Sequence, residues 1–263
     1  MPAATGPLYP VTGFDISSLK GATLIIPSVS LGNVPQLAAD LIVSSLGLKR
    51  VAFLGTGNTT APFAGRGEDG LVTGGLELYG AAGQPIFVLL QRAPTLKTKK
   101  DAHVELISAL AHNYGVDVTL VLTSLDAANQ DDAQLLTPHQ AVVPPTPAPH
   151  PVLGRLAQLP ALRLTLETNT RAPAKETTTY PPFLPGAGLT RRILAAVADV
   201  PSGAVSAWVV EGDNRGDAHA LAAVALGVLG IETQITEPST WKGLFGSADG
   251  WSGGSGLDAE IYG

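Results

Sequence analysis

Short runs of strand-forming residues alternate with helix-spaced apolar residues along this chain, and this alternation limits the possible folds more than any other feature. Thr23–Ile26 is a β-branched and aliphatic run ended by Pro27, which predicts a buried strand. A helix is predicted next, because Asn33 is a good N-cap and apolar residues then recur at helical spacing until Gly47. Val51–Leu54 is a second apolar run. Strand, helix and strand in this order indicate a parallel βαβ unit.

The same alternation continues toward the C-terminus and predicts an α/β fold. Two strand candidates, Leu76–Tyr79 and Ile86–Leu90, are separated by the turn-rich Gly80–Gly83 and are expected to form a hairpin. Because alternating strands and helices build a sheet covered on both faces, we expect a central, mostly parallel sheet flanked by helices. The remaining candidates are strands at 116–122, 162–166, 205–210 and 231–235, and helices at 102–114, 190–197, 217–229 and 241–245.

The middle of the chain has a different character from the segments on either side. Ala141–Pro151 holds five prolines, and Thr168–Pro185 is rich in threonine and proline. Such composition favours extended loop over packed core. We therefore expect one α/β domain over 1–246, with a long, loop-like Pro/Thr-rich excursion at about 137–182 and a flexible tail at 247–263.

The charge and composition exclude several classes of partner. The chain has 263 residues, a formal net charge of -6 and no cysteine. An acidic protein lacks the basic surface that binds nucleic acid or anionic lipid, and its apolar runs are shorter than a membrane span. No signal-peptide pattern is present at the N-terminus, so the cytosol or nucleus is the expected compartment. We expect no nucleic acid, membrane or cofactor among its partners.

Motifs for metal or nucleotide binding are weak. Gly55-Thr56-Gly57 follows a predicted strand, but no third glycine or convincing helix completes a dinucleotide fingerprint, so an ordinary turn is favoured. The histidines are not spaced for a shared metal ion, and structural or exposed roles are expected for all of them. The five are His103, His112, His139, His150 and His219.

The best local indication of an enzyme is the acidic segment Glu211-Gly212-Asp213-Asn214, which follows the predicted strand at 205–210. Active sites of α/β proteins lie beyond the carboxyl ends of strands, so Glu211 and Asp213 are candidate catalytic carboxylates. The alternative is a turn whose Asp and Asn side chains bond to nearby backbone and lead into the next helix. No histidine, lysine or metal partner is predictable beside the two carboxylates, which favours the turn.

The C-terminus carries a separate signal. Ser247–Gly256 is rich in glycine and serine, which predicts a flexible tether. The chain then ends in Ile261, Tyr262 and Gly263, a hydrophobic residue, a tyrosine and a third residue bearing the terminal carboxylate. A pocket that offers a cation and backbone donors can capture such an end. The alternative is a frayed terminus.

Three segments of this chain resemble the proteasome assembly chaperone 2 family, in matching order and with similar spacing over nearly the whole chain. The resemblance covers no part of about 137–182. The matching residues are Thr23–Val34 with Gln36–Ile42, Val210–Asn214 with Asp217-Ala218, and Ser239–Trp241 with Leu244–Gly246.

This resemblance implies a non-enzymatic binding protein. Family members form a heterodimer with a related chain of the proteasome assembly chaperone 1 type. The pair binds the outer face of a forming ring of proteasome α-subunits and prevents premature or wrong association. Some members end in a hydrophobic–tyrosine–any tripeptide that inserts between neighbouring α-subunits, and Ile261, Tyr262 and Gly263 match it. Two hypotheses therefore stand, namely this chaperone and an α/β hydrolase or phosphorylase-like enzyme that acts through Glu211 and Asp213.

Overall fold

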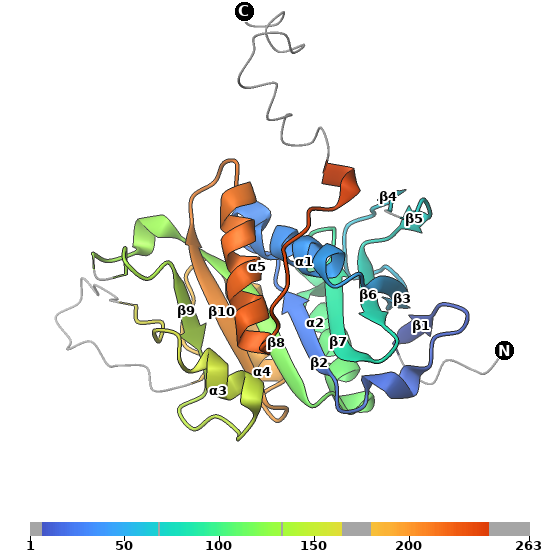
Figure 1. Ribbon diagram of the computed structural model, residues 1–263, viewed down its shortest axis with the longest axis horizontal. Helices are drawn as coiled ribbons and strands as arrows, with labels where there is room; N and C mark the ends of the chain where they lie inside the picture. Colours follow the sequence, from blue (N-terminus) through green and yellow to red (C-terminus); the bar gives the residue numbers. More distant parts are fainter. Residues whose placement is uncertain (1–6, 68, 133, 165–179, 242–263) are drawn as a thin grey trace, which may run out of the picture.

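An eight-stranded mixed sheet forms the centre of the protein (Figure 1). The computed structural model describes residues 7–67, 69–132, 134–164 and 180–241. In sheet order the strands are β1 (Leu8–Pro10), β3 (Lys49–Leu54), β6 (Leu76–Ala81), β7 (Gln84–Gln91), β2 (Thr23–Pro27), β8 (Val118–Asp126), β10 (Ser202–Val209) and β9 (His139–Val142).

The helices connect these strands, and a small ribbon projects from one connection. The ribbon pairs β4 (Gly65–Arg66) with β5 (Val72–Thr73) inside the segment that joins β3 to β6. Short 3-10 turns lie at Ile16–Leu19, Leu31–Asn33, Lys97–Lys99, Ala127–Asn129 and Ser239–Trp241. The α-helices are α1 (Val34–Ser45), α2 (Lys100–Asn113), α3 (Pro151–Leu156), α4 (Gly188–Ala196) and α5 (Arg215–Leu229).

Parallel pairing occupies the middle of the sheet, and antiparallel pairing both flanks. The strands β7, β2, β8 and β10 are neighbours and run in the same direction. Antiparallel pairs join β1 to β3, β3 to β6, β6 to β7 and β10 to β9. The predicted fold class, an α/β protein with a central, mostly parallel sheet, is confirmed, as is the predicted hairpin of β6 and β7.

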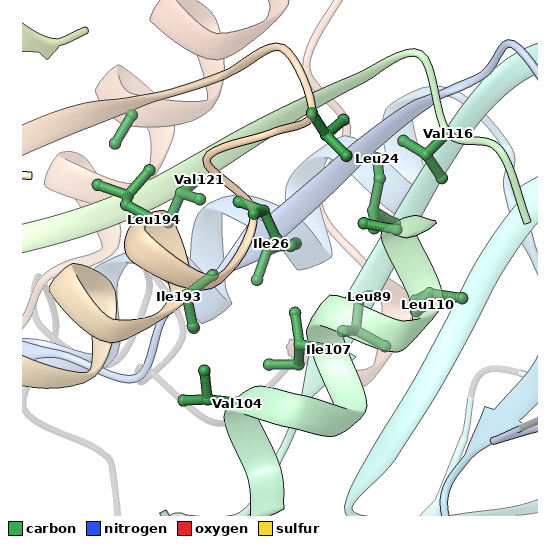
Figure 2. Close-up of a cluster of buried hydrophobic side chains, with 14 of the residues drawn as sticks. Leu24, Ile26, Leu89, Val104, Ile107, Leu110, Val116, Val121, Ile193 and Leu194 are labelled. Atoms are coloured by element: carbon green, nitrogen blue, oxygen red, sulfur yellow. The ribbon is translucent and has the colours of Figure 1, made fainter. Parts of the chain in front are cut away.

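Helices cover both faces of the sheet, as the alternation predicted. In Figure 1, α1 and α5 lie in front of the sheet, and α2 and α4 lie behind it. Successive residues of a strand point to opposite faces, so Leu24 and Ile26 of β2 pack toward α2 and α4 while Ile25 packs toward α1 and α5. Figure 2 shows part of the α2 side, where Ile107 and Leu110 approach the β2 side chains. Both core clusters are apolar, so burial on each face stabilises the sheet.

The beginning of α1 has the predicted position but not the predicted capping contact. Asn33 is the N-cap, yet its backbone is left-handed (φ 54°) and its side chain makes no capping hydrogen bond. The helix is positioned instead by burial of Val34, Ala38 and Leu41 in the core. Packing therefore outweighs local capping at this helix.

The predicted parallel βαβ unit at the start of the chain is wrong in one respect. The strands β2 and β3 do run in the same direction, but they are not neighbours. The hairpin of β6 and β7 lies between them and pairs with both. Only the pairing of strands distant in sequence reveals this insertion, because the local pattern of strand, helix and strand is identical in both arrangements.

The Pro/Thr-rich excursion is more ordered than its composition suggested. The strand β9 pairs with β10 at the edge of the sheet, and the short helix α3 packs against α5. Pro151 begins α3, where a missing N–H costs nothing, and Leu153 and Leu156 are buried. The expectation of loop is therefore wrong for these two elements, because proline at a first helical turn or beside an edge strand is compatible with packing.

Three weaker expectations also change. The strand predicted at 162–166 is absent from its described part, 162–164, and 165–166 lie outside the described residues. The segment 231–235 has no regular structure; Ile231 and Ile235 pack against the core on the α5 side instead. A short helical turn occurs at Ser239–Trp241, and the rest of the predicted turn at 241–245 is not described. Within the described ranges, no helix combines the length and the apolar character needed to span a bilayer.

Candidate functional site

Two of the three segments that carry the family resemblance meet at the carboxyl edge of the parallel strands. The loop after β2 is joined to the end of β8, where the backbone N–H of Ser124 donates to Ser30 Oγ at 3.0 Å. The Ser124 hydroxyl donates to the Leu31 carbonyl at 2.6 Å. Beneath this loop, Thr190 of α4 donates to Ser28 Oγ at 2.8 Å, and both side chains are buried. Buried hydroxyls therefore hold the loop to two other elements.

The acidic segment after β10 lies beside the same loop. Asn214 is buried, and its side-chain amide donates to the Gly32 carbonyl at 3.2 Å. Asp213 accepts a hydrogen bond of 3.2 Å from the backbone N–H of Arg215 at the start of α5. Glu211 is exposed. The segment forms a turn in which Asp213 bonds to nearby backbone, as one of the two sequence hypotheses predicted, whereas Asn214 bonds to backbone that is distant in sequence.

The histidines are dispersed, and their described contacts are made with other elements or within their own helix. His103 is buried in α2 with Nδ1 3.0 Å from Thr59 Oγ1 and Nε2 3.1 Å from Gln91 Oε1. Burial lowers the pKa of His103 to about 4, so the ring is neutral at pH 7. Among the described residues, no three His, Asp or Glu side chains gather in a way that could hold a metal ion.

The chain is anchored to α5 shortly before the described residues end. Glu237 accepts hydrogen bonds from Arg215 Nε at 2.7 Å and Nη2 at 2.5 Å, and His219 Nε2 lies 2.8 Å from the same carboxylate. The Arg215 hydrogen bond holds the pKa of Glu237 below its usual value, with a smaller contribution from His219. The segment that follows α5 runs between α5 and α1 to the buried Trp241 (Figure 1). The predicted docking residues Ile261, Tyr262 and Gly263 lie outside the described residues.

A buried ion pair holds the connection between β3 and β6. Arg50 Nη1 lies 2.8 Å from Glu77 Oε1, and their side chains are 7% and 0% exposed. Glu77 also accepts hydrogen bonds from the Thr73 and Tyr79 hydroxyls at 2.5 and 2.9 Å and from the Gly74 N–H. Because every partner binds the same carboxylate, its charge is compensated and the turn before β6 is held in place.

Two adjoining crevices lie between α1 and the segment that joins β3 to β6. One, of about 350 Å³, is lined by Lys49, Arg66 and Tyr79 among others. The other, of about 430 Å³, is lined by residues that include Gln36 and Leu90. Sequence reasoning missed both crevices, because their walls come from elements that are far apart along the chain and carry no common motif.

Comparison with known proteins identifies the family. The PAC2 family model matches residues 24–225. Proteasome assembly chaperone 2 of Danio rerio is 32% identical over 254 residues, which cover 90% of this chain and 96% of that protein. The human protein of the same name is 25% identical, with coverage of 89% and 96%.

Solved structures share the fold at low sequence identity. An archaeal homolog of proteasome-assembly chaperone, PbaA of Pyrococcus furiosus, has a TM-score of 0.64 at 13% identity, covering 94% of this chain and 96% of that one. PbaB of the same organism, described as an archaeal proteasome activator, has a TM-score of 0.55 at 13% identity, with coverage of 87% and 90%. The resemblance drawn from the sequence is confirmed, and the chain belongs to the PAC2 family, as a relative of proteasome assembly chaperone 2.

Proposed function

We propose that this chain is an assembly chaperone of the proteasome core particle. It forms a heterodimer with a related chain of the proteasome assembly chaperone 1 type, and the pair binds the forming ring of α-subunits and prevents off-pathway association. The observation that carries the proposal is the family match over residues 24–225, together with relatives named proteasome assembly chaperone 2 that align with about nine-tenths of the chain.

In this proposal the C-terminal tripeptide docks between two α-subunits. Ile261 fills an apolar depression, Tyr262 packs its ring, and the Gly263 carboxylate faces a pocket lysine. The ion pair of Glu237 with Arg215 supports docking of the tripeptide, because it fixes the chain to the folded domain shortly before the predicted tail. If residues 247–260 form the flexible tether that their Gly/Ser content predicts, they span roughly 19–22 Å on average. The tail then searches near the ring at an effective concentration of about a millimolar.

We further propose that the chain has no catalytic activity and that Glu211-Gly212-Asp213-Asn214 is structural. The side chains of Asp213 and Asn214 are engaged with backbone groups at the beginning of α5 and in the loop after β2. An acid–base pair needs a second titratable group within hydrogen-bond reach of the reacting atoms. The contacts of Asp213 and Asn214 instead serve to join β10, α5 and the loop after β2.

Co-purification tests the proposal directly. The chain is expressed with an N-terminal tag in the cells to which it is native, so that its C-terminal carboxylate stays free. Mass spectrometry of the purified material is expected to recover proteasome α-subunits and one homologous chaperone chain. Recovery of neither from cells that are assembling proteasomes would refute the proposed function. A tagged, unrelated acidic protein of similar size serves as the control for non-specific capture.

A further inference from the structure

The crevice at Gln36 lies where the connections of two neighbouring strands part. The strands β2 and β7 are adjacent and parallel. The chain leaves β2 into α1 on one face of the sheet, and it leaves β7 into α2 on the opposite face. In α/β proteins, ligands bind beyond the carboxyl ends of strands at this kind of divergence. Here the crevice of about 430 Å³ is lined there by Val29, Gln36, Leu90 and Pro94.

The second crevice continues the first along α1. Phe63 and Arg92 line both, so the two spaces adjoin and form one elongated groove, which we call the α1 groove. Its far end is lined by Lys49 and Arg66, neither of which has an ion pair within the described ranges, and by Asp69, whose carboxylate lies 3.2 Å from Arg50. The Lys49 and Arg66 side chains are exposed. A compact ligand fills one crevice only, whereas an extended chain fills both and meets positive charge at one end.

Polar groups without partners belong to two residues of the groove, Gln36, which lines the crevice of about 430 Å³, and Arg92, which lines both crevices. Both terminal atoms of the Gln36 amide are shielded from solvent and have no hydrogen-bond partner in the described part of the protein. The Arg92 Nε is in the same condition, although its Nη atoms bind Asp40 at 2.9 and 3.2 Å. Burying an amide without a partner is costly, so its presence here indicates a state in which it is paired.

We propose that the α1 groove binds an extended peptide segment of a partner protein, with an apolar side chain near Leu90 and an acidic side chain near Lys49 and Arg66. One residue of an extended chain presents its N–H and C=O on the same side, and the Gln36 amide offers the matching acceptor and donor. A change of Gln36 rotamer, an ordinary adjustment at interfaces, turns the amide to the groove. This inference does not depend on the proposed proteasome function.

A peptide library tests the proposal with the intact chain. Phage-displayed random heptapeptides are panned against the protein, and one enriched peptide is synthesised with a fluorophore for anisotropy measurements. The enriched sequences are expected to carry an acidic residue and an apolar one. Gln36→Leu is expected to weaken binding about tenfold, while the melting temperature stays equal or rises because an unpaired amide has been removed. A purely structural glutamine would instead lower the melting temperature when replaced.

Two further variants keep the test decisive. Gln84→Leu makes the same chemical change at the exposed opposite end of β7 and is expected to leave affinity unchanged. The exposed pair Lys49→Glu with Arg66→Glu is expected to weaken binding by tenfold or more and to reduce its dependence on salt. Failure to enrich any peptide over an unrelated bait overturns the proposal. Equal affinity of the wild type and of both groove variants overturns it as well.

Discussion

The side-chain amide of Asn214 donates a hydrogen bond of 3.2 Å to the backbone carbonyl of Gly32, across 182 positions of sequence. Gly32 has a left-handed backbone with φ 65°, and a Cβ placed on it would lie 2.3 Å from Asn214 Nδ2. The contact joins the loop after β2 to the turn after β10, and only glycine leaves room for it. Two segments that resemble the family are therefore parts of one structural junction.

Replacing Gly32 with alanine is expected to destabilise the protein by about 2–4 kcal/mol, because the change adds a clash with Asn214 to the cost of a left-handed alanine. Urea unfolding followed by circular dichroism measures the loss. Gly21→Ala is the matched control, since Gly21 also has positive φ (74°) but no atom within 4 Å of the added Cβ. Equal losses in the two variants would show that Asn214 moves aside at no cost.

Removing one partner of the buried pair Arg50–Glu77 is expected to be severe. Glu77→Ala removes the buried partner of Arg50 and leaves the guanidinium only the half-exposed Asp69 carboxylate among its described ion-pair partners, so the expected loss of unfolding free energy is about 3–5 kcal/mol. The control is Asp69→Ala, which removes a carboxylate that is 41% exposed and 3.2 Å from the same guanidinium, at an expected cost of about 0–1 kcal/mol. Comparable losses for both variants would contradict the assigned importance of burial.

Burial of His103 predicts a loss of stability in mild acid. The native pKa is about 4 and the reference value is 6.5, so the unfolded chain binds the proton first as pH falls. The neutral His103 ring makes its full contribution to the unfolding free energy above pH 6.5, and this contribution is lost as the pH falls from 6.5 to 4. At 1.36 kcal/mol per pKa unit, the full contribution is roughly 3 kcal/mol. Urea midpoints at pH 7, 6 and 5 measure it.

His103→Gln is the comparison for this pH dependence, because glutamine keeps hydrogen-bonding capacity but does not titrate. The variant is expected to lose stability less steeply between pH 6.5 and 5 than the wild type does. His139 remains in both proteins, and burial lowers its pKa too, so its contribution cancels in the difference. Parallel pH profiles for the two proteins would mean that His103 does not control this transition.

Changes to the C-terminal tripeptide are expected to weaken ring binding without affecting the fold. Deletion of Ile261–Gly263, Tyr262→Ala, and one residue appended after Gly263 should each reduce affinity for core-particle precursors by about tenfold or more. The added residue displaces the carboxylate by up to about 3.5 Å, beyond the reach of one salt bridge. Surface-attached precursors provide the affinity, and melting temperature should be unchanged. Three unaltered affinities would identify the tripeptide as a chance match.

Glu211 and Asp213 provide the test against enzymatic function. The double variant Glu211→Gln, Asp213→Asn keeps side-chain size, and the amide oxygen that it introduces at position 213 can still accept the hydrogen bond from the Arg215 N–H. Ring binding and fold are expected to stay near normal, with at most about 0.5–1 kcal/mol lost from the missing charge at the beginning of α5. A hydrolytic or phosphorolytic activity of the wild type that this variant lacks would overturn the non-enzyme proposal.

The sequence by itself determined the local elements of this protein and its family. Runs such as Thr23–Ile26 and the helix ended by Gly230 are decided by hydrophobic period and by residues that permit left-handed backbone, and both are local properties. The family segments could be recognised for the same reason, since each is a short contiguous stretch. The turn at Asp213 and Asn214 was one of two readings that the local chemistry allowed.

Tertiary structure alone decided which elements became neighbours. The insertion of β6 and β7 between β2 and β3, and the pairing of the proline-flanked β9 with β10, depend on contacts between distant segments that no local pattern encodes. The same holds for the α1 groove, where Gln36 and Arg92 come from different elements. Local propensity is a property of a few consecutive residues, whereas burial and pairing are properties of the packed whole, so the junctions and crevices emerge only on folding.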